Sequence, residues 1–158
     1  MCSYFRIMKI STIFMLVLLS INASVKGSEI SESPNQQLIE VAENGNTEKV
    51  KNFLQNYAGD ISEVRVDINN AFIKAAENGH NDIVEILIQN DADINARDEY
   101  GYTALINAVL NGHKKVVKTI IQNNDNNINA KTDDGMTALS AAVNDDQEIF
   151  DIIIQTTG

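Results

Sequence analysis

Two histidines have the most obvious capacity for chemistry in this chain. His80 and His113 each follow a glycine, and they lie 33 residues apart. Imidazole rings one layer apart in a repeating structure could share a metal ion, but structural zinc sites take about four ligands, and no third one lies at metal spacing. We therefore interpret both residues as parts of a recurrent Gly-His turn, and we expect no metal site.

The acidic sequence Asp133-Asp134-Gly135 is similar to the start of a calcium-binding loop. The residues after it lack the alternating acids and the closing Glu of an EF-hand, so a hairpin turn is the better interpretation. The chain offers no Ser/His/Asp arrangement, no glycine-rich phosphate loop and no paired carboxylates outside the expected turns. Its one cysteine, Cys2, precedes the expected mature chain. We therefore expect neither catalysis nor a cofactor.

The chain is acidic, with a formal net charge of -10 over 158 residues. From Ser28 onward, 9 Lys and Arg stand against 22 Asp and Glu, a balance of -13. Such a surface repels phosphate backbones, so we expect no nucleic-acid partner. The charge would steer the protein towards a basic protein surface, although solubility alone is the simpler explanation.

The N-terminus has the pattern of a secretory signal peptide. Arg6 and Lys9 precede the apolar run 10–21, and small and polar residues follow it. The run is shorter than the roughly 20 residues that span a bilayer. A buried first helix is the weaker interpretation, because the run has no polar face.

We expect cleavage after Ala23 or Gly27, which leaves residues 1–27 as signal peptide and 28–33 as a polar linker. The mature protein would then be secreted or periplasmic and would have no membrane contact. An uncleaved N-terminal membrane anchor is the alternative.

Beyond the linker, the same residue types recur every 33 to 34 positions. Thr103-Ala104-Leu105 recurs as Thr137-Ala138-Leu139, and Gly79-His80 recurs as Gly112-His113. This period is typical of a solenoid, in which each repeat buries its apolar face against the next. The repeat region 34–158 divides into four repeats, at about 34–64, 65–97, 98–131 and 132–158.

Each repeat is predicted to form two short helices. In the third repeat, Thr103 caps the first helix, and Gly112 allows the positive φ of the turn that follows. Ser33-Pro34 predicts the start of the first helix in the array. A polar loop should end each repeat, as at Asp60-Ile61 in the first. The apolar residues expected in the core are Leu38, Val41, Ala42, Val50, Phe53, Leu54, Phe72, Ala75, Ala76, Ile83, Val84, Leu87, Ile88, Ala104, Leu105, Ala108, Val109, Val116, Val117, Ile120 and Ile121.

The last repeat departs from this pattern. It is one residue shorter, and Asp145-Asp146-Gln147 replaces Gly-His, which predicts a helix N-cap. Phe150 and Ile152 leave its second helix rather apolar. We expect them to pack internally and the protein to be a monomer, with self-association as the alternative.

The recurring positions resemble the ankyrin-repeat family over about residues 35–156. The third repeat carries most of the family pattern, in Asp98, Gly101, Thr103, Leu105, Ala108, Gly112, His113, Val116, Val117, Ile120 and Ile121. The resemblance implies an all-α solenoid of stacked helix-turn-helix units with β-hairpin-like loops. The family's Thr-Pro-Leu-His is replaced by Thr103-Ala104-Leu105-Ile106 and Thr137-Ala138-Leu139-Ser140. Because the histidine network is lost, we expect lower stability than in a consensus array.

The resemblance also implies a non-catalytic module that binds a protein partner through hairpin tips and a concave palm. Tyr100 and Tyr102 are the most prominent of these positions, because aromatic side chains are enriched at binding hot spots. Alternatively, Tyr102 packs against the next hairpin and Tyr100 is an isolated exposed ring. A second hypothesis is a structural or residual repeat fragment without a dedicated partner. The candidate binding residues are Arg97, Glu99, Tyr100, Tyr102, Lys131, Asp133, Asp134 and Met136 on the tips, and Glu77, Asn78, Leu110, Asn111, Asn144 and Asp145 on the palm.

Overall fold

The computed structural model describes residues 34–56, 61–123 and 128–157. All of them lie in the second of two compact units, Ser33–Gly158, and the expected signal peptide and linker fall outside the described residues. Within this part of the chain, no helix is long and apolar enough to cross a membrane. The described residues form eight helices, α2 (Pro34–Glu43), α3 (Thr47–Asn56), α4 (Ile61–Glu77), α5 (Asn81–Gln89), α6 (Ala104–Leu110), α7 (Lys114–Gln122), α8 (Ala138–Asp145) and α9 (Gln147–Thr157).

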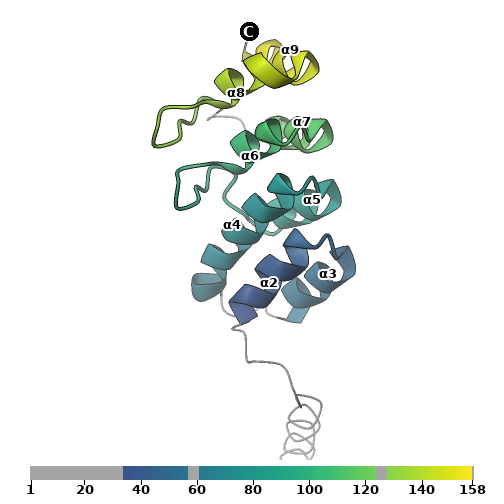
Figure 1. Ribbon diagram of the computed structural model, residues 1–158. Coiled ribbons are helices and arrows are strands. Elements are labelled where there is room, and N and C mark those ends of the chain that lie inside the picture. The colour runs from purple at the N-terminus through teal and green to yellow at the C-terminus, as the bar shows by residue number, and fades with distance from the viewer. Residues whose placement is uncertain (1–33, 57–60, 124–127, 158) are drawn as a thin grey trace, which may run out of the picture. The chain divides into compact units, whose positions relative to one another are not determined.

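The helices stack in antiparallel pairs, as Figure 1 shows for α2/α3, α4/α5, α6/α7 and α8/α9. The first helices of the pairs contact one another in the order α2, α4, α6, α8. The second helices form a parallel row in the order α3, α5, α7, α9. The main helix contacts thus join each pair to its neighbours, and the prediction of an all-α solenoid is confirmed.

A continuous core runs through the four pairs. Phe72, Leu87 and Ile120 are fully buried, and small residues such as Ala75 and Ala108 let neighbouring first helices approach closely. The predicted core positions are buried except for Val41, Phe53, Leu54 and Ile88, which are half-buried against the core, as are Phe150 and Ile152 of α9.

Glycine allows the turn within each of the first three pairs. Gly45, Gly79 and Gly112 have φ of 73°, 76° and 73°, as predicted for Gly112. In the fourth pair Asp146 makes the turn with an extended backbone. Its carboxylate accepts hydrogen bonds from the backbone N–H groups of Glu148 and Ile149 at 3.0 and 3.4 Å. Asp146 therefore caps α9, as the sequence predicted.

The first helices of the third and fourth pairs begin at threonine caps. Thr103 accepts a hydrogen bond from the backbone N–H of Ile106 at 3.3 Å. Thr137 and Ser140 form a reciprocal capping box, because each side chain also accepts from the other residue's backbone N–H. Ser140 stands at the position of the missing histidine and supplies part of the lost hydrogen bonding.

The prediction of a loop at Asp60-Ile61 is wrong for Ile61, which begins α4. This helix has 17 residues and extends back into the range 34–64 that the sequence assigned to the first repeat. The position equivalent to Gly101 is occupied by Ile68, so no glycine interrupts the helix there. The chain therefore continues as helix where the later pairs form a hairpin.

The two histidines connect successive pairs. His80 lies 2.8 Å (Nε2) from the carbonyl oxygen of Glu43, and His113 lies 2.9 Å from that of Glu77. A carbonyl only accepts, so Nε2–H is the donor in both bonds. Each ring packs over the turn glycine of the preceding pair, Gly45 or Gly79. The histidines thus bind the neighbouring pair and not their own helix.

A buried polar contact joins α5 to α7. The hydroxyl of Thr119 donates to the side-chain oxygen of Asn81 at 2.8 Å, and both residues are buried. The Asn81 amide nitrogen in turn donates to the carboxylate of Glu85 at 2.6 Å. Because Thr119 supplies a hydrogen to a buried oxygen, its loss leaves that acceptor without a partner.

We expect Thr119→Val to lower the free energy of unfolding by about 1–2 kcal/mol, the cost of an unsatisfied buried acceptor. Urea denaturation followed by far-ultraviolet circular dichroism measures this change. Thr119→Ser is the matched control, because it keeps the hydroxyl, and it should lose less. Equal destabilisation by both substitutions would mean that the methyl group and not the hydrogen bond stabilises this contact.

Candidate protein-binding surface

The first hairpin, residues 97–103, is shaped by the carboxylate of Asp98. One oxygen of Asp98 accepts hydrogen bonds from the backbone N–H groups of Tyr100 and Tyr102, both at 2.9 Å. The Asp98 backbone N–H also donates to the carbonyl of Tyr102 at 3.0 Å. Three hydrogen bonds therefore hold the backbone that carries the two tyrosines.

The second hairpin, residues 131–137, uses the hydroxyl of Thr132 in the same place. This hydroxyl accepts from the backbone N–H of Met136 at 2.9 Å and also bonds to the carboxylate of Asp134. The Thr132 backbone N–H donates to the carbonyl of Met136 at 2.9 Å. The hydrogen bond from Thr132 keeps the pKa of Asp134 below its ordinary value, so Asp134 is ionised at neutral pH.

A salt bridge connects the two hairpins. Arg97 Nη2 lies 2.9 Å from Asp133 Oδ1, and Arg97 Nε donates to the carbonyl of Gly101 at 3.1 Å. The pair covers Gly101 so closely that a Cβ there would collide with both side chains. Because both partners are substantially exposed, the bridge contributes only about 0–1 kcal/mol. Its main effect is to position one hairpin against the other.

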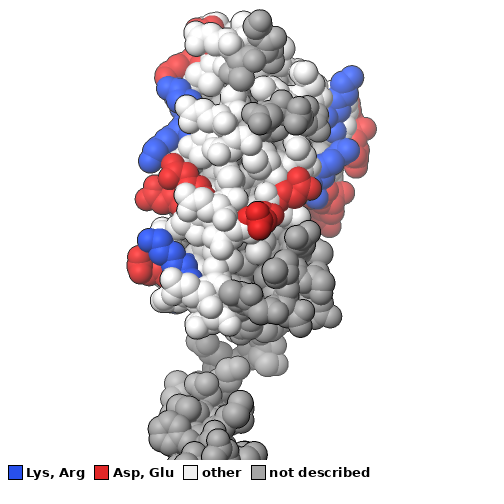
Figure 2. All heavy atoms as spheres, turned by 180° about the vertical axis from the view of Figure 1, so that it is seen from behind, with Lys and Arg blue, Asp and Glu red and all other residues white. Residues whose placement is uncertain are grey.

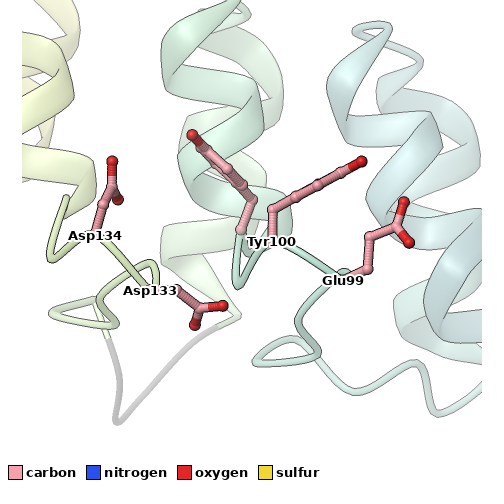
Figure 3. Close-up of a pocket in the computed structure, with 5 residues that line it drawn as sticks. Glu99, Tyr100, Asp133 and Asp134 are labelled. Carbon is pink, nitrogen blue, oxygen red and sulfur yellow. The ribbon is translucent and has the colours of Figure 1, made fainter.

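A shallow, open hollow of about 430 Å³ lies between the hairpins; we call it the hairpin hollow. Figure 3 shows Glu99 and Tyr100 on the first hairpin and Asp133 and Asp134 on the second. Tyr100 is 65% exposed, whereas Tyr102 is half-buried against the core. The structure thus brings together five of the predicted residues, Glu99, Tyr100, Tyr102, Asp133 and Asp134.

The other predicted tip residues do not line the hollow. Arg97 is engaged with Asp133, and Met136 is half-buried against the core. Lys131 is exposed and makes no ion pair with any described residue. Arg97 and Met136 therefore support the hairpins, and Lys131 remains an isolated positive charge beside them.

The predicted palm residues lie elsewhere along the first helices. Leu110 ends α6, about 10 Å along the helix from the first hairpin at 1.5 Å per residue. It is 39% exposed. The side chains of Asn111 and Asn78 each donate to a carbonyl four residues earlier, at 2.9 and 3.0 Å, so they cap helix ends. Glu77 pairs with Lys74 at 2.7 Å. The side chains of Asn144 and Asp145 fall outside those that the structure describes.

The structural role of two hairpin residues was not predicted from the sequence. Asp98 and Thr132 stand four positions before Tyr102 and Met136, at equivalent places in the repeat. An Asp or Thr ahead of a turn residue and a glycine is a signal for a side chain that binds the turn backbone. This signal could have identified both residues.

The last two pairs are joined by an ionic contact where the earlier pairs use histidine. Lys114 lies 3.1 Å from Asp146 and 2.7 Å from Glu148. Hydrogen bonds to Glu148 and Asp146 raise the pKa of Lys114. Partial desolvation opposes ionisation of Asp146, but its bonds with Lys114 and with the backbone N–H groups of Ile149 and Glu148 lower its pKa overall.

This contact predicts a pH dependence. The pKa of folded Asp146 lies below its ordinary 3.8, so its stabilisation is present above pH 3.8 and is lost as the pH falls through the folded value. The pKa of folded Lys114 lies above 10.5, so its contribution is lost only as the pH rises through that higher value. Asp146→Asn should therefore show a smaller fall in melting temperature below pH 3.8, measured by circular dichroism.

The control for this prediction is Asp151→Asn, which removes a carboxylate from the same helix. Asp151 accepts a hydrogen bond from Gln147 and has no lysine partner among the described residues. The acid-side fall of this variant should match that of the unmodified protein. An unchanged acid profile in Asp146→Asn would contradict the assignment.

Acidic and basic side chains lie close to one another on the surface of the array. Figure 2 shows a face on which they lie mainly along two edges, with acidic and basic groups side by side and a mostly uncharged strip between them. Ion pairs also join successive repeats, such as Lys115 with Asp82 at 3.6 Å and Lys118 with Glu148 at 3.9 Å. Within the described part of the chain, no group of three or more His, Cys, Asp or Glu is placed to hold a metal ion.

Comparisons with known proteins agree with this architecture. A family model described as ankyrin repeats, in three copies, matches residues 38–132 and 101–158. No curated protein matches the chain. Ankyrin repeats generally mediate protein–protein interactions and are typically not catalytic. The matched residues span most of the sequence, and they coincide with the stacked helix pairs and their hairpins, so the chain belongs to the ankyrin-repeat family.

Proposed function

We propose that this protein is an exported, non-catalytic module that binds another protein through its hairpins and the adjoining first-helix surface. The observation that carries the proposal is the pair of ordered hairpins, which present Tyr100 at 65% exposure beside Glu99. Their backbones are held by Asp98 and Thr132, so little conformational freedom is lost when a partner binds.

The size of the surface suits an ordinary complex. Hairpins and first helices of an array this long can bury about 800 Å² on one side of an interface. Leu110 adds an exposed apolar contact on α6. The acidic balance of the chain favours a basic partner and disfavours nucleic acid. We propose that the protein acts as a monomer.

Export rests on the N-terminal sequence alone. Arg6 and Lys9 ahead of the apolar run 10–21 have the order of a signal peptide. Mass spectrometry of the protein from its native culture tests this part of the proposal. A mature form that begins near residue 24 or 28 and is found outside the cytosol is expected, whereas a cytosolic form with its first 20 residues would contradict export.

Binding is tested by affinity capture from a lysate of the source organism and of any host. The bait is compared with Tyr100→Ala/Tyr102→Ala/Leu110→Ala. Ile154→Ala is the control, because Ile154 is 43% exposed but lies on the second helix α9, away from the hairpins and the first helices. Circular dichroism first establishes that each variant is folded. We expect a protein that the unmodified bait and the control retain and the triple variant loses.

Other results would change the proposal. A protein retained equally by all three baits would place the binding surface elsewhere. No retained protein would favour the alternative hypothesis, a structural or residual repeat fragment without a dedicated partner.

A further inference from the structure

We propose that the hairpin hollow receives an arginine side chain from a basic segment of the partner protein. The inference rests on the proposed protein-binding function and specifies the partner chemistry. Its basis is the combination of two tyrosines with three carboxylates around one open hollow, contributed by Glu99, Tyr100, Tyr102, Asp133 and Asp134.

The charge in the hollow is only partly compensated. Oδ1 of Asp133 forms a salt bridge with Arg97. Among the described residues, this is the only ion pair at the hollow. Asp134 bonds to the neutral hydroxyl of Thr132, which leaves its negative charge uncompensated. Glu99 is exposed, and its side chain makes no ion pair or hydrogen bond with any described residue. The lining therefore has room for a further positive charge.

The tyrosines distinguish this place from an ordinary acidic surface. A cation over an aromatic face gains about 0.5–2 kcal/mol, depending on how far it is desolvated. Tyr100 offers an exposed ring, and the half-buried Tyr102 offers part of a second. A planar guanidinium can stack on such a ring while its N–H groups reach a carboxylate, whereas an ammonium group is more strongly hydrated and does not stack. Arginine therefore fits this lining better than lysine.

The lining is already positioned before a ligand arrives. Asp98 holds the backbone of the first hairpin, and Thr132 holds that of the second. The Arg97–Asp133 salt bridge joins the two hairpins, and both of its side chains lie against Gly101. Binding an arginine would order only the side chains of Glu99 and Tyr100, which keeps the entropic cost small.

The experiment adds a short Gly/Ser peptide that carries two arginines to the isotopically labelled full-length protein. Binding is followed through the backbone amide signals in nuclear magnetic resonance spectra. Two matched peptides carry lysine or citrulline at the same places. Backbone amide shifts should move for 99–102 and 133–134. The arginine peptide should bind about three- to tenfold more tightly than the lysine peptide, and the uncharged citrulline peptide should not bind.

Variants assign the binding to the hollow. Tyr100→Ala should weaken arginine-peptide binding by about three- to tenfold, the loss of one cation–aromatic contact. Glu99→Gln should weaken it about twofold or more, because it removes one exposed partner charge. Glu40→Gln is the matched control, since Glu40 is also exposed but lies on α2, and it should leave binding unchanged.

Several results would overturn the assignment. They are amide shifts spread over acidic residues of other helices, equal binding of the arginine and lysine peptides, or equal weakening by Glu40→Gln and Glu99→Gln. Failure here is distinct from failure of the proposed function. A captured protein that depends on Tyr100 but is not displaced by the arginine peptide would retain protein binding and exclude arginine as the occupant.

Discussion

Replacement of Phe72 with alanine is expected to lower the free energy of unfolding by about 3–5 kcal/mol, more than any other single substitution that we propose. Phe72 is fully buried in α4 and is the largest of the fully buried side chains. Its helix contacts α2, α5 and α6, so the lost ring leaves a cavity between successive pairs. Small domains have a free energy of unfolding of about 5–15 kcal/mol, so the variant would lose a large part of its stability.

Urea denaturation followed by circular dichroism measures the effect. Val143→Ala is the control, because Val143 is 61% exposed, and it should change the free energy of unfolding by about 0.5 kcal/mol or less. In a solenoid each pair is stabilised by its neighbours. Loss of the Phe72 ring in the second pair should therefore also make the first and third pairs unfold less cooperatively with each other. A loss below about 1 kcal/mol would mean that the pairs do not pack as described.

The second large effect is expected at a glycine turn. Gly79→Ala should lower the free energy of unfolding by about 2–4 kcal/mol. One part is the strain of a side chain at φ of 76°. The other part is steric, because the new Cβ would lie 2.6 Å from Nδ1 of His113. The imidazole would have to move, and its hydrogen bond to the Glu77 carbonyl would be lost.

Gly112→Ala separates these two contributions. Gly112 has nearly the same φ, 73°, but a Cβ there meets no atom of the described residues within 4 Å. This variant should lose only the backbone part, about 1–2 kcal/mol. Thermal and urea denaturation of both variants, together with Gly79→Ala/His113→Ala, measure the difference. Equal losses for Gly79→Ala and Gly112→Ala would show that the histidine adapts without cost.

The sequence predicted the helix pairs well, because their signals are local. Gly79 and Gly112 mark turns that need positive φ, and Thr103 marks a helix start through its own hydroxyl. Apolar spacing identified buried positions such as Val116 and Ile120. Each of these signals depends on residues within about one helical turn, so it can be recognised without knowing what packs against the helix.

Contacts between repeats were harder to predict, since they join residues more than 30 positions apart. The Gly-His pattern indicated a structural role for His113, but its bond to the Glu77 carbonyl of the preceding pair depends on how the pairs stack. The Arg97–Asp133 bridge likewise needs both hairpins in place. The long α4 also differed from expectation, because Ile68 stands where the later repeats have a hairpin glycine.

Helix propensity, capping and apolar spacing act along the chain. The repeat period, the helix pairs and the hairpin positions of Tyr100 and Asp134 could therefore be predicted without knowledge of the packing. The stacking of the repeats sets which of those positions share the hairpin hollow and which, such as Arg97, instead pair across the two hairpins. Whether a carboxylate is paired with a cation or is free to bind a ligand depends on the side chains of the neighbouring repeat. Their positions depend on how the repeats stack, which the spacing of residues along the chain does not reveal.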